Sequence, residues 1–77
     1  MTKTPLHELR AGESAILSEI AETLPLRQRL LDLGWSSGTP IQIVRKSLFG
    51  DPIQFQVRES QFAIRKYDAA QIQVFRN

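Results

Sequence analysis

The sequence contains no cysteine and only one histidine, His7, among its 77 residues. Without cysteine the chain can form neither a disulfide framework nor a thiolate metal site. One imidazole is too few for a structural zinc site within one molecule, so we expect no resident metal or cofactor. His7 and Glu8 could contribute ligands only to an ion shared between two molecules, and a solvent-exposed histidine is the simpler interpretation.

Long apolar runs are also missing, since no uninterrupted apolar stretch exceeds three residues. A membrane-spanning helix needs about 20 such residues, and a signal peptide needs an apolar segment that residues 1–14 lack. The sequence therefore predicts a cytosolic protein that is complete from Met1. Its length predicts a single domain over residues 1–77, with no room for a second core.

Catalytic motifs are absent as well. The eight carboxylates form no motif-spaced pair, and no HExxH or other metal signature occurs. The serines have no local base because His7 is the only imidazole. Gly34 and Gly38 do not form a phosphate-binding loop, since no Gly-Lys-Ser/Thr follows them. We therefore predict that the chain is not an enzyme.

Charge is spread unevenly along the chain. Residues 1–44 carry four basic and five acidic groups, whereas residues 45–77 carry six basic and three acidic groups, giving net charges of −1 and +3. The basic half suits an acidic partner, a phosphate or an anionic membrane surface. A solvated sheet face with lysine and arginine at its edges explains the charge more simply.

What the sequence does contain is a succession of short elements. Thr4 and Pro5 predict a capped helical turn over Pro5–Leu9, and Thr23 predicts the N-cap of one longer helix, Leu24–Leu33. Alternating apolar residues predict strands at Ser14–Ile20, Thr39–Ser47, Ile53–Val57, Gln61–Arg65 and around Ile72 and Val74. A 3₁₀ turn is expected at residues 66–70. These elements predict a mostly β protein with one inserted helix, folded as a small barrel of about five strands whose closure protects the sheet edges.

Burial can be assigned to individual positions. Ser14–Ile20 has Ile16 and Ile20 on one face and Ala15 and Leu17 on the other, which predicts burial of both faces. The helix should bury a leucine stripe consisting of Leu26, Leu30 and Leu33, widened by Leu31. Backbone geometry is the simplest role for the residues that punctuate the junctions, namely Gly34 as the left-handed end of the helix and Gly38, Gly50, Asp51 and Pro52 at turns.

The order and spacing of these glycine, proline and leucine positions resemble the sequence pattern of the FeoA family. The resemblance rests on Arg29-Leu-Leu-Asp-Leu-Gly34, Gly38-Thr39, Gly50-Asp51-Pro52-Ile53, Ala63-Ile64-Arg65-Lys66 and the Ala70-x-Ile72-x-Val74 end, and it covers about Leu9 to Val74. It implies an SH3-like barrel and a role in bacterial ferrous iron uptake beside FeoB, a membrane permease with a cytosolic GTPase domain. Two departures stand out: Trp35 replaces the usual Leu or Met, and the hairpin at Arg58-Glu59-Ser60 lacks a glycine.

The resemblance implies an adaptor or regulator that binds the cytosolic region of a FeoB-type permease and reaches the membrane only through that partner. A direct activator of the GTPase is a variant of this hypothesis, and oligomers are compatible with it. Arg27 and Arg29 could then act as arginine fingers, although ordinary surface arginines explain them more simply.

The alternative is a nucleic-acid-binding barrel that stacks bases on Phe55, Phe62 and Tyr67. We expect Phe55 and Phe62 to face inward, and the net charge is small, so no nucleic acid is expected as a partner.

Five residues are candidates for contact with a protein partner. Trp35 follows the helix end and either caps the barrel or stays exposed as an anchor. Leu48 and Phe49 lie in a loop with no obvious buried destination, which is typical of a binding tip. Arg45 and Lys46 precede this loop and could steer the partner electrostatically.

Overall fold

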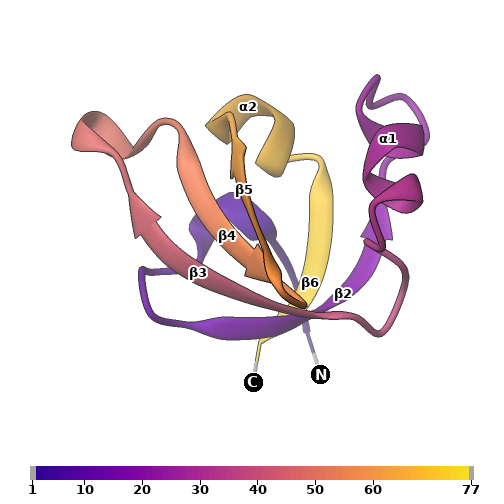
Figure 1. The fold of residues 1–77 in the computed structure, drawn as a ribbon, viewed down its shortest axis with the longest axis horizontal. Helices are drawn as coiled ribbons and strands as arrows, with labels where there is room; N and C mark the ends of the chain where they lie inside the picture. The colour runs from indigo at the N-terminus through magenta and orange to yellow at the C-terminus, as the bar shows by residue number, and fades with distance from the viewer. Residues whose placement is uncertain (1, 77) are drawn as a thin grey trace.

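The computed structural model describes residues 2–76. It contains six strands, two short α-helices and two 3₁₀ turns. Figure 1 shows their arrangement. The strands are β1 (Lys3–Pro5), β2 (Ser14–Ile20), β3 (Pro40–Lys46), β4 (Ile53–Val57), β5 (Ser60–Ile64) and β6 (Ile72–Arg76). The helices are α1 (Arg27–Asp32) and α2 (Lys66–Ala69), and the 3₁₀ turns are η1 (Leu6–Glu8) and η2 (Leu48–Gly50). The predicted mostly β class is confirmed.

The strands form one antiparallel sheet in the order β1-β6-β2-β3-β4-β5. Two irregularities, at Leu17/Glu19 in β2 and at Ile43/Arg45 in β3, increase the bend of their strands. The sheet curls around its core (Figure 1). Within residues 2–76 no ladder joins the end strands β1 and β5, so the predicted closure of the barrel by pairing is incomplete.

The strand count exceeds the predicted five because residues 3–5 form β1. Thr4 pairs with Val74 of β6, and the turn that follows begins at Leu6 rather than at Pro5. Thr4 is therefore not an N-cap. Pairing with β6 gives these backbone groups hydrogen-bond partners that an isolated helical turn would leave unpaired.

The prediction that β2 is buried on both faces is wrong. Ala15, Leu17 and Ile20 are buried, whereas Ile16 is only partly covered. The irregularity between Leu17 and Glu19 shifts the register by one residue, and such a shift turns the following side chains to the opposite face. Ile20 therefore joins the core face of Ala15 and Leu17 instead of the face of Ile16.

Helix α1 is shorter than predicted. It spans only Arg27–Asp32, Leu26 occupies its N-cap position, and Thr23 lies in the preceding turn without capping it. Six residues are fewer than two turns, so a stripe at i, i+4 and i+7 cannot form. Leu30 is buried as predicted, but Leu33 lies beyond the last helical residue and is 49% exposed. The assignment of Leu33 to the core is therefore wrong.

The end of α1 follows the prediction for Gly34, whose φ is +101°. Its N–H donates to the Leu31 carbonyl at 3.1 Å, and the Trp35 N–H donates to the Leu30 carbonyl at 2.9 Å. This pair of bonds is the Schellman arrangement, in which apolar residues on either side of the glycine pack together. Here these residues are Leu30 and Trp35, and both are buried.

Two further local predictions need correction. Residues 66–69 form an α-helical turn, not a 3₁₀ turn, because the N–H groups of Ala69 and Ala70 donate to the carbonyls four residues earlier. Strand β5 begins at Ser60, which pairs with Val57, so Arg58 and Glu59 alone form the hairpin loop. Arg58 has a φ of +56° there and adopts the left-handed backbone conformation without a glycine.

Candidate interaction surface

The loop that joins β3 to β4 carries two of the most exposed apolar side chains in the described chain. We call residues 47–52 the β3–β4 tip. Leu48 and Phe49 lie at its end and are 81% and 92% exposed. The predicted exposure of this loop is therefore confirmed. Figure 1 shows the tip projecting at one side of the molecule, at the upper left of the view.

The backbone of the tip is well defined by hydrogen bonds. The Ser47 N–H donates to the Pro52 carbonyl at 3.0 Å, and the Gly50 N–H donates to the Ser47 carbonyl at 2.7 Å. Gly50 has a φ of +77°, and the Asp51–Pro52 peptide bond is cis. The turn roles predicted for Gly50, Asp51 and Pro52 agree with this geometry. Gly38, at φ +91°, likewise turns the chain into β3.

Phe49 has a φ of +70°, although it is neither glycine nor asparagine. The left-handed region costs a residue with a Cβ roughly 1–2 kcal/mol. A bulky residue held there, with its ring in solvent, gains no compensating burial. Such outliers are concentrated at sites where the side chain has a function.

Helix α2 extends the surface beside the tip. The carboxylate of Asp51 accepts a hydrogen bond from the Lys66 N–H at 3.0 Å, which links the tip to the first residue of α2. Tyr67 follows and is 78% exposed. The sequence suggested Tyr67 only for base stacking. Its place beside the tip depends on a contact between residues 15 positions apart, for which no local pattern exists.

Arg45 and Lys46 lie at the base of the tip, at the end of β3. The Arg45 Nε donates to the side-chain oxygen of Gln54 at 2.7 Å, and the Lys46 Nζ donates to the backbone carbonyl of His7 at 3.1 Å. Both acceptors are neutral, and the ion pairs found within residues 2–76 involve other side chains. The two cations therefore add uncompensated positive charge next to exposed apolar groups.

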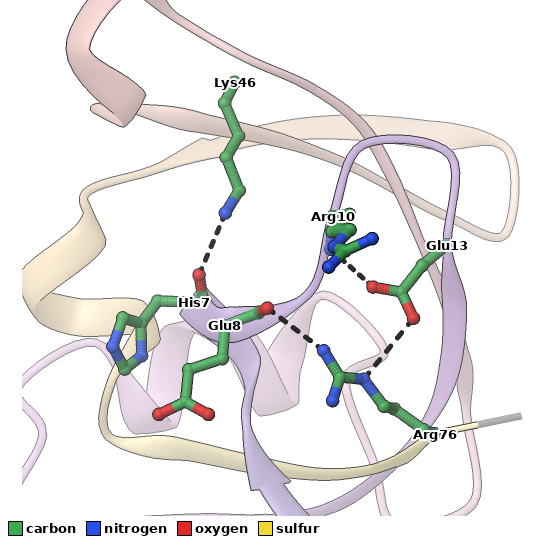
Figure 2. A network of polar contacts seen from close by, with 6 residues as sticks. All are labelled: His7, Glu8, Arg10, Glu13, Lys46 and Arg76. Carbon is green, nitrogen blue, oxygen red and sulfur yellow. Dashed lines mark hydrogen bonds and ion pairs between the residues drawn. The ribbon is translucent and has the colours of Figure 1, made fainter.

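A polar network links the N-terminal turn η1 to β3 and β6 (Figure 2). Besides the Lys46 contact, Arg76 of β6 donates to the Glu8 carbonyl at 3.2 Å and lies 3.4 Å from the Glu13 carboxylate. The Arg10 N–H donates to the same carboxylate at 2.6 Å. This hydrogen bond is the main cause that lowers the pKa of Glu13, and the Arg76 charge lowers it further.

His7 and Glu8 are neighbours in η1, and Figure 2 shows both with the backbone carbonyls that take part in this network. The His7 Nδ1 atom is buried and has no hydrogen-bond partner within residues 2–76. In that part of the chain no three His, Asp or Glu side chains are grouped so as to hold a metal. A shared ion between two molecules stays a prediction for this pair.

Trp35 does not belong to the exposed surface, because its exposed fraction is 0%. Its ring packs edge-on against Phe55 and Phe62, with centroid distances of 6.0 and 5.5 Å. The interpretation of Trp35 as a partner contact is therefore wrong, and the side chain fills the barrel core. Phe55 and Phe62 are covered by this packing against Trp35. Of the three residues proposed for base stacking, only Tyr67 is exposed.

The fold and this surface define the class of the protein: a small, curled antiparallel barrel with an exposed apolar tip. Within residues 2–76 no helix is long and apolar enough to cross a membrane. A model of the FeoA domain matches residues 4–76. The chain belongs to the FeoA domain family, whose members are non-catalytic accessory domains linked to ferrous iron transport.

Similar proteins agree with this assignment. The FeoA protein of Chlorobium tepidum is 32% identical, with a TM-score of 0.88, over 95% of this chain and 70% of its own. The zinc complex of Stenotrophomonas maltophilia FeoA, described as an SH3 domain protein, is 28% identical with a TM-score of 0.78, over 92% of this chain and 88% of its own. These neighbours confirm the predicted SH3-like fold.

A curated relative joins the domain to a transporter. It is the Fe(2+) transport protein A/Fe(2+) transporter FeoB fusion protein of Porphyromonas gingivalis, which is 29% identical over 69 residues. The aligned region is 90% of this chain but only 8% of the fusion protein. The transporter itself therefore lies almost wholly outside the region that this chain matches.

Proposed function

We propose that this protein is a cytosolic accessory protein that binds the cytosolic region of a FeoB-type ferrous iron permease and regulates it. The whole chain, residues 1–77, is one domain in this proposal, and it reaches the membrane through its partner. The observation that carries the proposal is the fusion relative, in which a domain matching 90% of this chain is joined to a FeoB transporter. Fusion keeps two modules at a high effective concentration, which favours modules that act together.

The contact surface in this proposal is the β3–β4 tip with its two flanking cations. Leu48 and Phe49 supply exposed apolar area, and desolvated apolar anchors contribute most of the binding energy at many interfaces. Arg45 and Lys46 have no acidic partner within the described residues. They would raise the association rate with an acidic partner surface.

Substitution of Phe49 tests this surface sharply, because the aromatic ring can be removed without disturbing the backbone conformation at this position. Phe49→Gly removes the ring and suits a φ of +70°, so the variant should be as stable as the wild type or more stable. Retention by the immobilised cytosolic region of the permease should nevertheless fall about tenfold or more, as for a hot-spot residue. Leu33→Ala, which truncates an exposed leucine on the α1 side of the molecule, is the control and should leave retention unchanged.

Binding of the wild type must be measured in each nucleotide state of the permease. Absence of retention in every state, with and without the membrane portion, would refute direct association. Normal retention of Phe49→Gly would refute the tip as the contact surface while leaving association intact.

Activation of the permease GTPase is a separate mechanistic proposal. Arg29 is exposed on α1 and could reach a bound nucleotide, whereas Arg27 is partly buried. An arginine finger accelerates GTP hydrolysis by about 10³-fold or more. GTP turnover measured with wild type and with Arg29→Lys distinguishes an activator from an adaptor: an adaptor leaves turnover unchanged, and an activator that uses Arg29 loses its effect in the variant.

A further inference from the structure

A pocket is lined by residues of α1 and of the end of β2. Figure 1 shows α1 on the side of the molecule away from the β3–β4 tip. The volume of the pocket is about 200 Å³. Apolar side chains from both elements line it, namely Leu17, Ile20 and Leu31. Nothing in the proposed contact with the permease uses this pocket.

Two side chains that line the pocket have unsatisfied hydrogen-bond donors. The Nε1 atom of Trp35 and the Nε atom of Arg27 are both buried, and neither has a hydrogen-bond partner within residues 2–76. Both groups can only donate. A buried donor without an acceptor is costly, and most buried polar groups in proteins are paired. Two such donors in the lining of one pocket indicate a ligand that brings acceptor atoms.

The charge around the pocket favours an anion. Glu19 also lines the pocket, but its carboxylate is paired with Lys3. Arg27 has no ion pair within the described residues, so its guanidinium is the uncompensated charge. A guanidinium binds a carboxylate through charge-assisted hydrogen bonds, which are stronger than neutral ones.

We propose that this pocket binds the C-terminal carboxylate of an apolar peptide. The carboxylate accepts hydrogen bonds from Arg27 and from the indole N–H of Trp35, and the last apolar side chain packs on Leu17, Ile20 and Leu31. Because the two nitrogens are covered in the free chain, the partly buried Arg27 side chain must rotate to admit the ligand. An inorganic anion would leave the apolar lining unfilled, whereas a peptide end uses both features.

The single tryptophan of the chain provides a direct reporter. We would record the indole N–H resonance by ¹H–¹⁵N NMR while adding N-acetyl-leucyl-leucine or its C-terminal amide. The acid should shift this resonance in a saturable manner, and the amide should bind about tenfold more weakly because it lacks the charge. Equal affinities for acid and amide, or no saturable shift with the acid, would overturn the proposal.

Two arginine variants complete the test. Arg27→Gln shortens the side chain and removes the charge, and it should weaken binding of the acid about tenfold. Arg29→Gln makes the same change on the exposed part of α1 and should leave binding unchanged. If both variants or neither of them weakens binding, Arg27 is not the carboxylate ligand. This experiment uses no permease, so its outcome is independent of the proposed function.

Discussion

Leu30 and Leu33 lie three residues apart at the end of α1, yet their side chains have opposite environments. Leu30 is 4% exposed and packs in the core, whereas Leu33 is 49% exposed. Removing a buried leucine side chain to alanine costs about 2–5 kcal/mol, because apolar burial is lost and a cavity is left. Leu30→Ala should therefore lower the free energy of unfolding by about that amount, and Leu33→Ala by less than about 1 kcal/mol.

Urea unfolding of the two variants measures this difference with matched chemistry. Equal losses of stability would mean that Leu33 also packs in the core, as the leucine spacing alone predicts. The reason for the difference is local: α1 ends at Asp32, and the backbone of Leu33 already has φ −91° and ψ 5°. Periodic spacing predicts a buried stripe only as far as the helix continues.

At the scale of elements, predictions succeed where neighbouring residues determine the structure. The Leu33-Gly34 pair ends α1 through local hydrogen bonds, and the period-two pattern of β4 follows Ile53–Val57 without error. Strand β1 could not be predicted in the same way, because its partner β6 lies at the other end of the sequence. For the same reason the sequence did not decide whether Trp35 is buried or exposed. Its burial depends on packing against Phe55 and Phe62, which are distant in the chain.

For the exposed β3–β4 tip, the sequence predicted the exposure of the residues but not their geometry. The sequence predicted an exposed tip because Leu48 and Phe49 had no apolar pattern to join. It could not predict the positive φ of Phe49 or the contact of Asp51 with α2, because neither depends on residue type at the tip alone. The composition of the candidate surface was therefore accessible from sequence, and its geometry was not.

The contact between β6 and the turn before β2 should make stability depend on acid pH. Hydrogen bonding by the Arg10 N–H, together with the charge of Arg76, lowers the pKa of Glu13 in the folded chain. Its stabilising contribution is therefore complete above the pKa of a free glutamate, about 4.3, and is lost as the pH falls through the lower folded value. Glu13→Gln keeps an acceptor for Arg10 but removes the charge.

We expect wild type to be more stable than Glu13→Gln at pH 7, and the two to converge at an acid pH below the lowered folded pKa of Glu13. Chemical denaturation at both pH values provides the measurement. Glu22→Gln is the control, because this exposed carboxylate has no described polar contact within residues 2–76. A stability difference between wild type and Glu13→Gln that stays constant with pH would show that Glu13 acts through packing alone.

At the scale of the whole molecule, the two proposed surfaces lie on different sides of the barrel. Figure 1 shows the β3–β4 tip on one side and α1, which lines the pocket together with β2, on the other. Substitutions at distant sites without shared contacts usually have additive effects. Phe49→Gly should therefore weaken permease retention without changing the affinity for N-acetyl-leucyl-leucine. Arg27→Gln should do the reverse, and the double variant should show both losses at their single-variant size. Competition between the dipeptide and the permease would contradict this separation, because it would require the pocket to be part of the permease interface.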